Sequence, residues 1–142
     1  MKTKTVAIMC LIAAALVASG QALPKQRSPT NLTGHYRFRK GEFRNHLSVL
    51  QLSGGRIKFN LTALWVSPNN PENIHNGEIA GVVAVSSGTA IYENGDCKIS
   101  MQFSRTGVVV REDHAGDDCG FGVNVSAAGV YRKIDSKKPR FQ

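Results

Sequence analysis

Apolar and polar residues alternate with a period of two along much of this chain, which is the pattern of a half-buried β-strand. The clearest case runs from Ile57 to Trp65, where apolar residues occupy every second position. A period of two over nine residues does not fit a helix. Similar patterns predict further strands over residues 36–39, 45–52, 79–85, 89–92, 97–104, 108–110, 121–126 and 130–131.

Short runs rich in glycine, asparagine, serine and proline separate these segments and predict turns. Gly54 and Gly55 permit the positive φ of a tight hairpin, and Asn94-Gly95 is the strongest short hairpin signal in the chain. Ser86-Ser87-Gly88 predicts another turn. No segment after the N-terminal apolar run has a helical period, so the pattern predicts an antiparallel all-β domain of eight or nine strands.

Closure into a small antiparallel β-barrel of about eight strands would remove the exposed edges of such a sheet. A barrel of this size is either filled by side chains or holds one small ligand. The sequence favours a filled interior because it supplies several large apolar side chains: Phe38, Phe59, Trp65, Met101, Phe103 and Phe121. A two-sheet β-sandwich is the alternative architecture.

The N-terminus has the three-part layout of a secretory signal peptide. Lys2 and Lys4 precede an apolar run over residues 6–17, and small or neutral residues follow up to Ala22. The run is too short for a membrane span, so we expect cleavage after Ala22 (or after Gly20) and a periplasmic or secreted protein. The predicted organisation is a signal peptide over 1–22, a flexible N-terminal arm over 23–33, a β-barrel domain over 34–134 and a basic C-terminal tail over 135–142.

Cleavage of this leader removes Cys10, so Cys97 and Cys119 are the only cysteines of the mature chain. An oxidising compartment favours a disulfide between them. Cys97 falls on the apolar face of its predicted strand, where a structural disulfide belongs. Closing the loop between the two cysteines is worth about 3 kcal/mol in the chain-entropy model.

The mature chain is basic, because 18 lysines and arginines against 10 acids become 16 against 10 when Lys2 and Lys4 are removed. The excess lies near the two ends of the chain, which converge if the first and last strands pair in a closed barrel. Such a surface attracts polyanions such as lipopolysaccharide, acidic glycan or nucleic acid. A merely solubilising surface is the alternative, because no nucleic-acid motif accompanies the charge. The candidate polyanion-binding residues are Arg37, Arg39, Lys40, Arg44, Arg132, Lys133, Lys137, Lys138 and Arg140.

Catalytic and metal-binding patterns are missing from the sequence. The acidic stretch over residues 112–118 lacks the alternating ligand spacing of a calcium loop. His35, His46, His75 and His114 lack metal-ligand spacing, and no G-x-S-x-G elbow occurs. We therefore expect no enzyme activity, no metal and no cofactor, and a partner that is either a protein or an anionic polymer. The pattern leaves the oligomeric state open.

One stretch carries a resemblance to a known family. Val85-Ser86-Ser87-Gly88-Thr89-Ala90-Ile91-Tyr92 resembles a signature of bacterial periplasmic lysozyme inhibitors, in which a Ser-Gly-x-x-Tyr-like stretch forms a loop on a small antiparallel β-barrel. In that family the loop enters the lysozyme cleft and covers the catalytic carboxylates. A Thr-Lys-Gly-type turn follows there. This chain has Glu93-Asn94-Gly95-Asp96-Cys97-Lys98 instead, which leaves Lys98 as the counterpart of the family's lysine.

The resemblance implies an exported inhibitor of a cell-wall hydrolase such as lysozyme, acting by inserting a rigid turn into the enzyme cleft. Ser86 and Ser87 would donate hydrogen bonds to carboxylates, and Gly88 would let the backbone approach closely. Tyr92 would serve as an aromatic anchor, with Lys98 as a further contact. The spacing alone is equally consistent with an ordinary hairpin turn and Tyr92 in the core. Polyanion binding by the basic ends is the alternative function.

Overall fold

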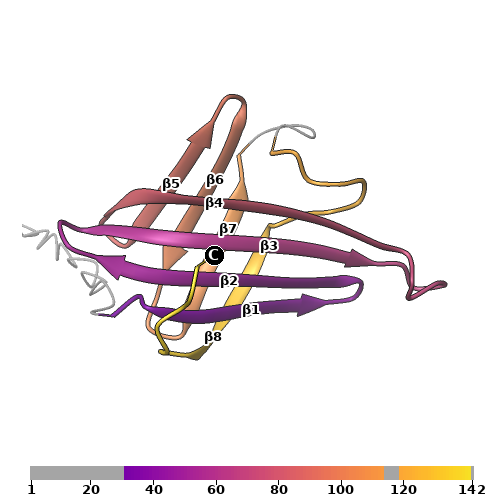
Figure 1. Ribbon diagram of the computed structural model, residues 1–142, viewed down its shortest axis with the longest axis horizontal. Coiled ribbons are helices and arrows are strands. Elements are labelled where there is room, and N and C mark those ends of the chain that lie inside the picture. Colours follow the sequence, from indigo (N-terminus) through magenta and orange to yellow (C-terminus); the bar gives the residue numbers. More distant parts are fainter. Residues whose placement is uncertain (1–30, 114–118, 142) are drawn as a thin grey trace, which may run out of the picture.

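The structure, a computed structural model, describes residues 31–113 and 119–141. Within these residues the chain forms eight antiparallel strands that close into a barrel (Figure 1). The predicted all-β barrel is confirmed, and the sandwich alternative is not adopted. The predicted signal peptide lies outside the described residues. The strands are β1 (Gly34–Lys40), β2 (Phe43–Leu52), β3 (Arg56–Val66), β4 (Ile74–Ser86), β5 (Thr89–Asn94), β6 (Cys97–Phe103), β7 (Gly107–Glu112) and β8 (Gly129–Asp135).

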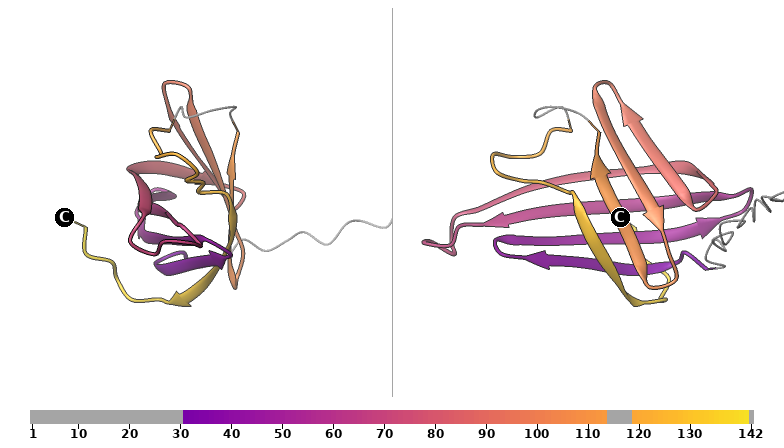
Figure 2. Two further views of the ribbon diagram at one scale, coloured as in Figure 1. Left: turned by 90° about the vertical axis from the view of Figure 1, so that its right-hand side faces the viewer. Right: turned by 180° about the vertical axis from the view of Figure 1, so that it is seen from behind.

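Each strand pairs with the next one along the chain, and β8 returns to pair with β1. Figures 1 and 2 show β1–β4 running side by side along the long axis, while β5–β8 cross them steeply on the other side of the barrel. The seams between strands are unequal in length. β3 and β4 pair over eleven register positions, whereas β4 and β5 pair over two, at Val85–Ala90 and Ser86–Thr89.

The barrel interior is filled by the inward-facing residues of the strands, which form one apolar cluster. Phe38 and Trp65 differ from the expectation of interior residues, because both are only half-buried. The Trp65 ring, at the end of β3, is tilted by 45° against His75, with 5.2 Å between centroids. The predicted burial is confirmed for Phe59, Met101, Phe103 and Phe121.

The segment before β1 closes one end of the barrel. Leu32 is buried there, and its carbonyl accepts a hydrogen bond of 2.7 Å from the hydroxyl of Tyr36. The Leu32 amide donates to Oε1 of Gln51 at 3.0 Å, and the Gln51 amide donates to Oγ1 of Thr33 at 3.0 Å. Burial raises the pKa of Tyr36 to about 12, so its hydroxyl keeps its proton and remains a donor. Residues 31–33, which we assigned to a flexible arm, are therefore docked on the barrel.

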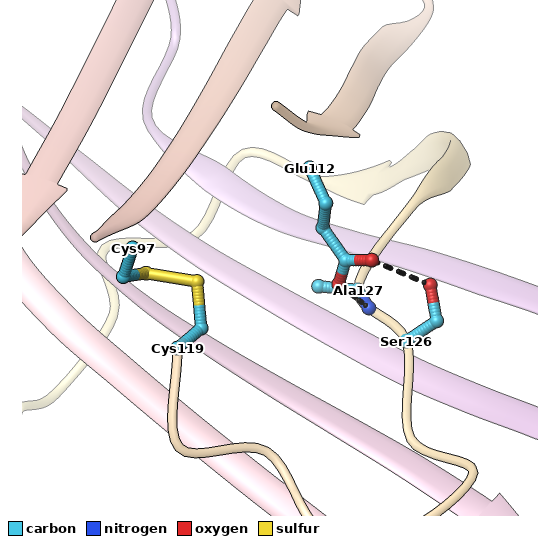
Figure 3. Close-up of a disulfide and its surroundings, with 5 residues drawn as sticks. All are labelled: Cys97, Glu112, Cys119, Ser126 and Ala127. Atoms are coloured by element: carbon cyan, nitrogen blue, oxygen red, sulfur yellow. Dashed lines mark hydrogen bonds between the residues drawn. A yellow bond between two sulfur atoms is a disulfide. The ribbon is translucent and has the colours of Figure 1, made fainter. Parts of the chain in front are cut away.

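The segment between β7 and β8 closes the other end in the same way. Ala127 is buried, and its carbonyl accepts a hydrogen bond of 2.7 Å from the hydroxyl of Tyr131. The Glu112 carboxylate accepts from the amide of Ala127 at 2.5 Å and from the hydroxyl of Ser126 at 2.9 Å (Figure 3). We call these two end-closing segments, residues 31–33 and residues 119–128, the plugs. At each plug, a buried tyrosine donates a hydrogen bond to the carbonyl four residues before it.

A disulfide fastens this second plug to the start of β6. Cys97 and Cys119 are bonded with an S–S distance of 2.03 Å, as the sequence predicts (Figure 3). Cys97 is buried on the inward face of its strand, and Cys119 packs against the core from the loop. The bond therefore links the plug to the sheet at the point where the described chain resumes after β7.

The predicted strand over residues 121–126 is wrong, because the described residues 119–128 form a loop. A turn closes on itself there: the Val125 amide donates to the Gly122 carbonyl at 3.0 Å, and Asn124 has a φ of 65°. Phe121 packs on Gly77 so closely that a Cβ at Gly77 would lie 2.2 Å from the ring. Along this stretch Phe121 is buried, Val125 is partly buried against the core and Val123 is 66% exposed, so the apolar alternation does not mark one face of a strand.

The C-terminal residues after β8 lie back across the outer face of β1–β3 (Figure 1). Pro139 is buried, and the ring of Phe141 lies under the Lys58 ammonium, with 4.8 Å between Nζ and the ring centroid. The stretch predicted as a basic tail is thus anchored on the barrel through its apolar residues. Among residues 31–113 and 119–141, no helix could span a membrane.

Candidate functional site

A ligand site inside this barrel is disfavoured by the way the barrel is built. Its interior is occupied by side chains, and Leu32 and Ala127 close its two ends. Small barrels of about eight strands either hold a ligand in an open mouth or fill their interior, and this chain does the second. The two sites predicted from the sequence both lie on the outer surface.

The first is the turn between β4 and β5. Ser87 and Gly88 both have positive φ, 50° and 79°, as the central residues of a type I′ hairpin turn do. The turn is held on both sides, because the Val85 amide donates to the Gly55 carbonyl and the Phe103 amide donates to the Gly88 carbonyl, each at 2.8 Å. Ser86 and Ser87 are exposed. The backbone is thus rigid and the two serines face solvent.

The other residues of this predicted site lie elsewhere. Tyr92 is half-buried, and its ring meets Phe59 edge-on with 5.5 Å between centroids. Lys98 forms an ion pair of 3.0 Å with Glu93, its partner in the β5–β6 register. That pair lies toward the opposite end of the β5–β6 hairpin from Ser87, roughly 13 Å along the strand from Thr89 at the usual rise per residue. The structure therefore brings together the serines and the glycine, but not Tyr92 or Lys98.

The second site is the seam where the barrel closes. Arg37 on β1 stands opposite Arg132 on β8. Closure thus brings the basic N-terminal and C-terminal strands together, as predicted. A surface groove of about 500 Å³ follows this seam. Its lining residues are Arg37, Phe38, Arg39, Lys40, Val130, Arg132 and Ile134.

The charge in this groove is unbalanced. Four of its lining residues are cationic and none is acidic. In the described part of the chain, Lys98 and Glu93 form the one ion pair, so the groove cations lack a carboxylate partner there. Like charges directly opposite each other on neighbouring strands are destabilising, and Arg37 and Arg132 are such a pair.

A second like-charge pair lies beside the groove, towards β2, and one of its members, Arg44, is outside the groove lining. Arg39 stands opposite Arg44 in the β1–β2 register. The Arg44 guanidinium turns back to its own hairpin, where Nη1 donates to the carbonyl of Phe43 at 2.8 Å and to that of Gly41. These carbonyls satisfy part of its hydrogen-bonding capacity but leave its charge uncompensated. Arg44 therefore adds to the positive field at the edge of the groove.

A pair of histidines, His35 and His46, lies beside these arginines. His46 on β2 stands opposite Arg37 on β1, and the Nε2 atom of His46 lies 3.3 Å from Nδ1 of His35. Burial lowers the pKa of His46, and the neighbouring His35 and Arg37 lower it further, against an opposing effect from Asp135. Protonation of His46 is thus disfavoured beside the basic seam.

The remaining predicted basic residues do not line the groove. Lys133 points to the end closed by Leu32: its Nζ donates to the Asn31 carbonyl at 2.9 Å and lies 5.6 Å from the Tyr36 ring centroid. Burial lowers the pKa of Lys133, with Asp135 acting in the opposite direction. Lys137, Lys138 and Arg140 are exposed on the C-terminal segment.

Two residues of the groove were not among the predicted site residues. Val130 and Ile134 are 65% and 43% exposed and flank Arg132 on the outer face of β8. The period-two pattern contained this signal, because residues 130, 132 and 134 of one strand share a face. The prediction selected residues by charge and so passed over the two aliphatic neighbours.

Other candidate chemistry is not assembled in the described residues. They contain no group of three or more histidine, cysteine or acidic side chains placed to hold a metal ion. His114 and most of the acidic stretch, residues 114–118, lie outside the described residues. Comparison with protein-family models, curated proteins and solved structures finds no match to this chain.

Proposed function

We propose that this protein binds an anionic ligand in the groove on the β1–β8 seam. The observation that carries the proposal is the placement of Arg37 opposite Arg132 in a groove with four cationic and no acidic lining residues. Guanidinium groups present a planar fork of donors that matches phosphate, sulfate or carboxylate oxygens. Two such groups on adjacent strands offer one anion contacts from both sides.

The energetics support a ligand over a purely solubilising surface. A solubilising surface intersperses charges of both signs, whereas this seam sets like charges opposite each other at a cost of up to about 1 kcal/mol per pair. A bound anion would offset that repulsion. Removing one arginine should therefore raise stability and weaken binding. A merely solubilising arginine would not give this combination.

The test compares Arg132→Gln with the wild type. At low salt the variant should unfold about 2 °C higher in the absence of ligand, because about 0.5 kcal/mol of repulsion is removed. The same variant should elute from heparin at lower salt. Arg56→Gln serves as the control, because Arg56 is exposed at the start of β3 and lies outside the groove.

The result that would contradict the proposal is equal heparin elution of the two variants. Arg56→Gln removes the same charge, so it measures the effect of net charge alone. A loss confined to Arg132→Gln supports the groove as the binding site. Thermal stabilisation of the wild type by heparin at low salt, reduced in Arg132→Gln, supports it independently.

A second candidate function is inhibition of a cell-wall hydrolase such as lysozyme by the turn Ser86–Gly88. The observation that favours it is the exposed, hydrogen-bonded turn with positive φ at Ser87. A preordered turn loses little conformational entropy on binding, and serine hydroxyls can donate to carboxylates in an enzyme cleft. Tyr92 and Lys98 do not support this function from their positions in the fold.

A turbidity assay of cell-wall lysis with c-, g- and i-type lysozymes tests this second function. Ser87→Gly removes the hydroxyl and retains a residue that tolerates positive φ, so the fold is preserved. Inhibition by the wild type and Arg132→Gln, but not by the double variant Ser86→Ala/Ser87→Gly, would support the turn. No inhibition of any of the three lysozymes at micromolar protein would exclude it.

A further inference from the structure

The aliphatic side chains of the groove indicate what kind of anion it takes. We infer that the groove binds the surface of a membrane that contains anionic phospholipid, an inference that rests on the proposed anion-binding function. Val130 and Ile134 are among the most exposed large apolar residues of the described chain, and both lie in the groove beside Arg132. Their placement pairs apolar surface with cationic surface on one face.

The apolar surface continues past the groove. Val109 on β7 stands opposite Val130 in the β7–β8 register, and both line a neighbouring surface recess. The outer face of β7 and β8 thus carries three aliphatic side chains, Val109, Val130 and Ile134, around Arg132. They lie beside a cationic row on β1 formed by Arg37 and Arg39. An anionic membrane offers the matching combination, with phosphates at the surface and methylenes directly beneath them.

A hydrophilic polyanion makes less use of this surface. Acidic glycans would contact the arginines and leave Val130 and Ile134 without apolar partners. Nucleic acid would contact the arginines through its phosphates, and a single strand would also need an exposed aromatic ring on which a base could stack. Phe38 is the aromatic residue of the groove, and its ring is half-buried against Tyr131, with 5.6 Å between the ring centroids. A lipid surface uses both components of the groove.

The experiment is co-sedimentation with vesicles of phosphatidylcholine containing one quarter phosphatidylglycerol, and with vesicles of phosphatidylcholine alone. The wild type should bind the first and not the second. Val130→Ser/Ile134→Ser should bind the anionic vesicles about tenfold or more weakly, because it loses two insertable side chains. Val82→Ser/Ile91→Ser is the matched control, since these residues are 50% and 47% exposed on β4 and β5, outside the groove.

Heparin elution of the same variants separates this inference from the proposed function. Val130→Ser/Ile134→Ser should elute from heparin at the same salt as the wild type, because its charge is unchanged. If this variant also binds anionic vesicles as tightly as the wild type, the groove recognises charge alone. The lipid inference then fails, while the proposed function stands. Equal binding to both vesicle types would also overturn the inference. Arg132→Gln and Arg56→Gln eluting together from heparin would instead defeat the proposed function.

Discussion

Asn45 shows how single polar residues fix the closure of this barrel. It is 1% exposed, and it is the buried polar side chain among the described residues. Its Nδ2 donates to the Ser126 carbonyl at 2.7 Å, while its Oδ1 accepts from the Leu64 amide at 3.0 Å. A single amide thus ties the plug between β7 and β8 to β3. Leu64 and Ser126 are themselves only partly buried, so Asn45 is the buried member of both bonds.

Asn45→Ala should lower the free energy of unfolding by about 3 kcal/mol, because it removes a buried side chain and leaves two partly buried backbone groups without their partner. Urea denaturation measures this loss. Asn60→Ala is the matched control, since Asn60 Nδ2 donates to the Glu78 carboxylate on the exposed face of the sheet. We expect its effect to stay below about 0.5 kcal/mol. Equal losses in the two variants would show that the Asn45 bonds do not hold the plug.

His46 gives the protein a pH dependence whose sign follows from its surroundings. Burial, His35 and Arg37 lower its pKa below the usual histidine value in the folded state. In the pH range between the folded and unfolded pKa, the unfolded chain binds more protons, so stability rises with pH. The stability is fully present above the unfolded pKa of about 6.5 and is lost as the pH falls through the folded pKa.

The expected result is a lower urea midpoint at pH 5 than at pH 7.5, with a smaller difference in His46→Gln. His75→Gln serves as the control histidine variant, because His75 lies at the start of β4, outside the His35–His46 pair. An identical pH dependence in wild type and His46→Gln would contradict the assignment. Bound anion beside Arg37 should favour protonated His46, so heparin should reduce the difference as well.

At the scale of elements, the alternating pattern predicted strands wherever one face is buried throughout. β3 is such a case, because four buried residues from Ile57 to Ala63 alternate with polar neighbours. The pattern failed at residues 121–126, where the one buried ring, Phe121, lies against Gly77 on β4 and no described strand pairs with the segment. Residue type reports hydrophobicity but does not report the close approach that only a glycine on another strand permits.

The candidate sites were predictable to different degrees for a related reason. Pairing of the first and last strands follows from closure, so the meeting of Arg37 and Arg132 could be anticipated. The separation of Lys98 from Ser87 depends on the β5–β6 register, which places Lys98 opposite Glu93. The inward direction of Tyr92 depends on the space left at Gly81, where a Cβ would lie 3.2 Å from the tyrosine ring. The alternation of apolar and polar residues within one strand encodes neither its register with the neighbouring strand nor the space available beside it.

The disulfide is the covalent link between β6 and the loop that closes the barrel. Cys119→Ser should lower stability by about 3 kcal/mol and the melting temperature by about 12 °C, because the chain between the cysteines is no longer constrained in the unfolded state. Calorimetry of the wild type with and without reductant, and of the Cys97→Ser/Cys119→Ser variant, measures the effect. A melting temperature that is insensitive to reductant would contradict the expected contribution.

At the scale of the whole molecule, the ring of strands has two unlike seams on opposite sides. The β1–β8 seam carries the cationic groove, and the β4–β5 seam is four strands away in the ring order. The latter pairs at only two positions, beyond which the strands diverge. Side chains bridge the divergence, with Tyr92 packed on Phe59 and against Gly81. Local opening should therefore begin at β4–β5 and leave the groove intact.

Tyr92→Ala tests this uneven distribution of stability. It removes the side chain that bridges the divergent strands, so amide hydrogen exchange should accelerate in β5 and remain unchanged in β2 and β3, which pair along most of their length. Ile91→Ala is the control, because Ile91 is 47% exposed on the outer face of β5. Heparin elution of Tyr92→Ala should match the wild type, since the groove lies on the other side of the barrel. Uniform acceleration across all strands would mean that the barrel opens as one cooperative unit, and the two seams would then not be independent.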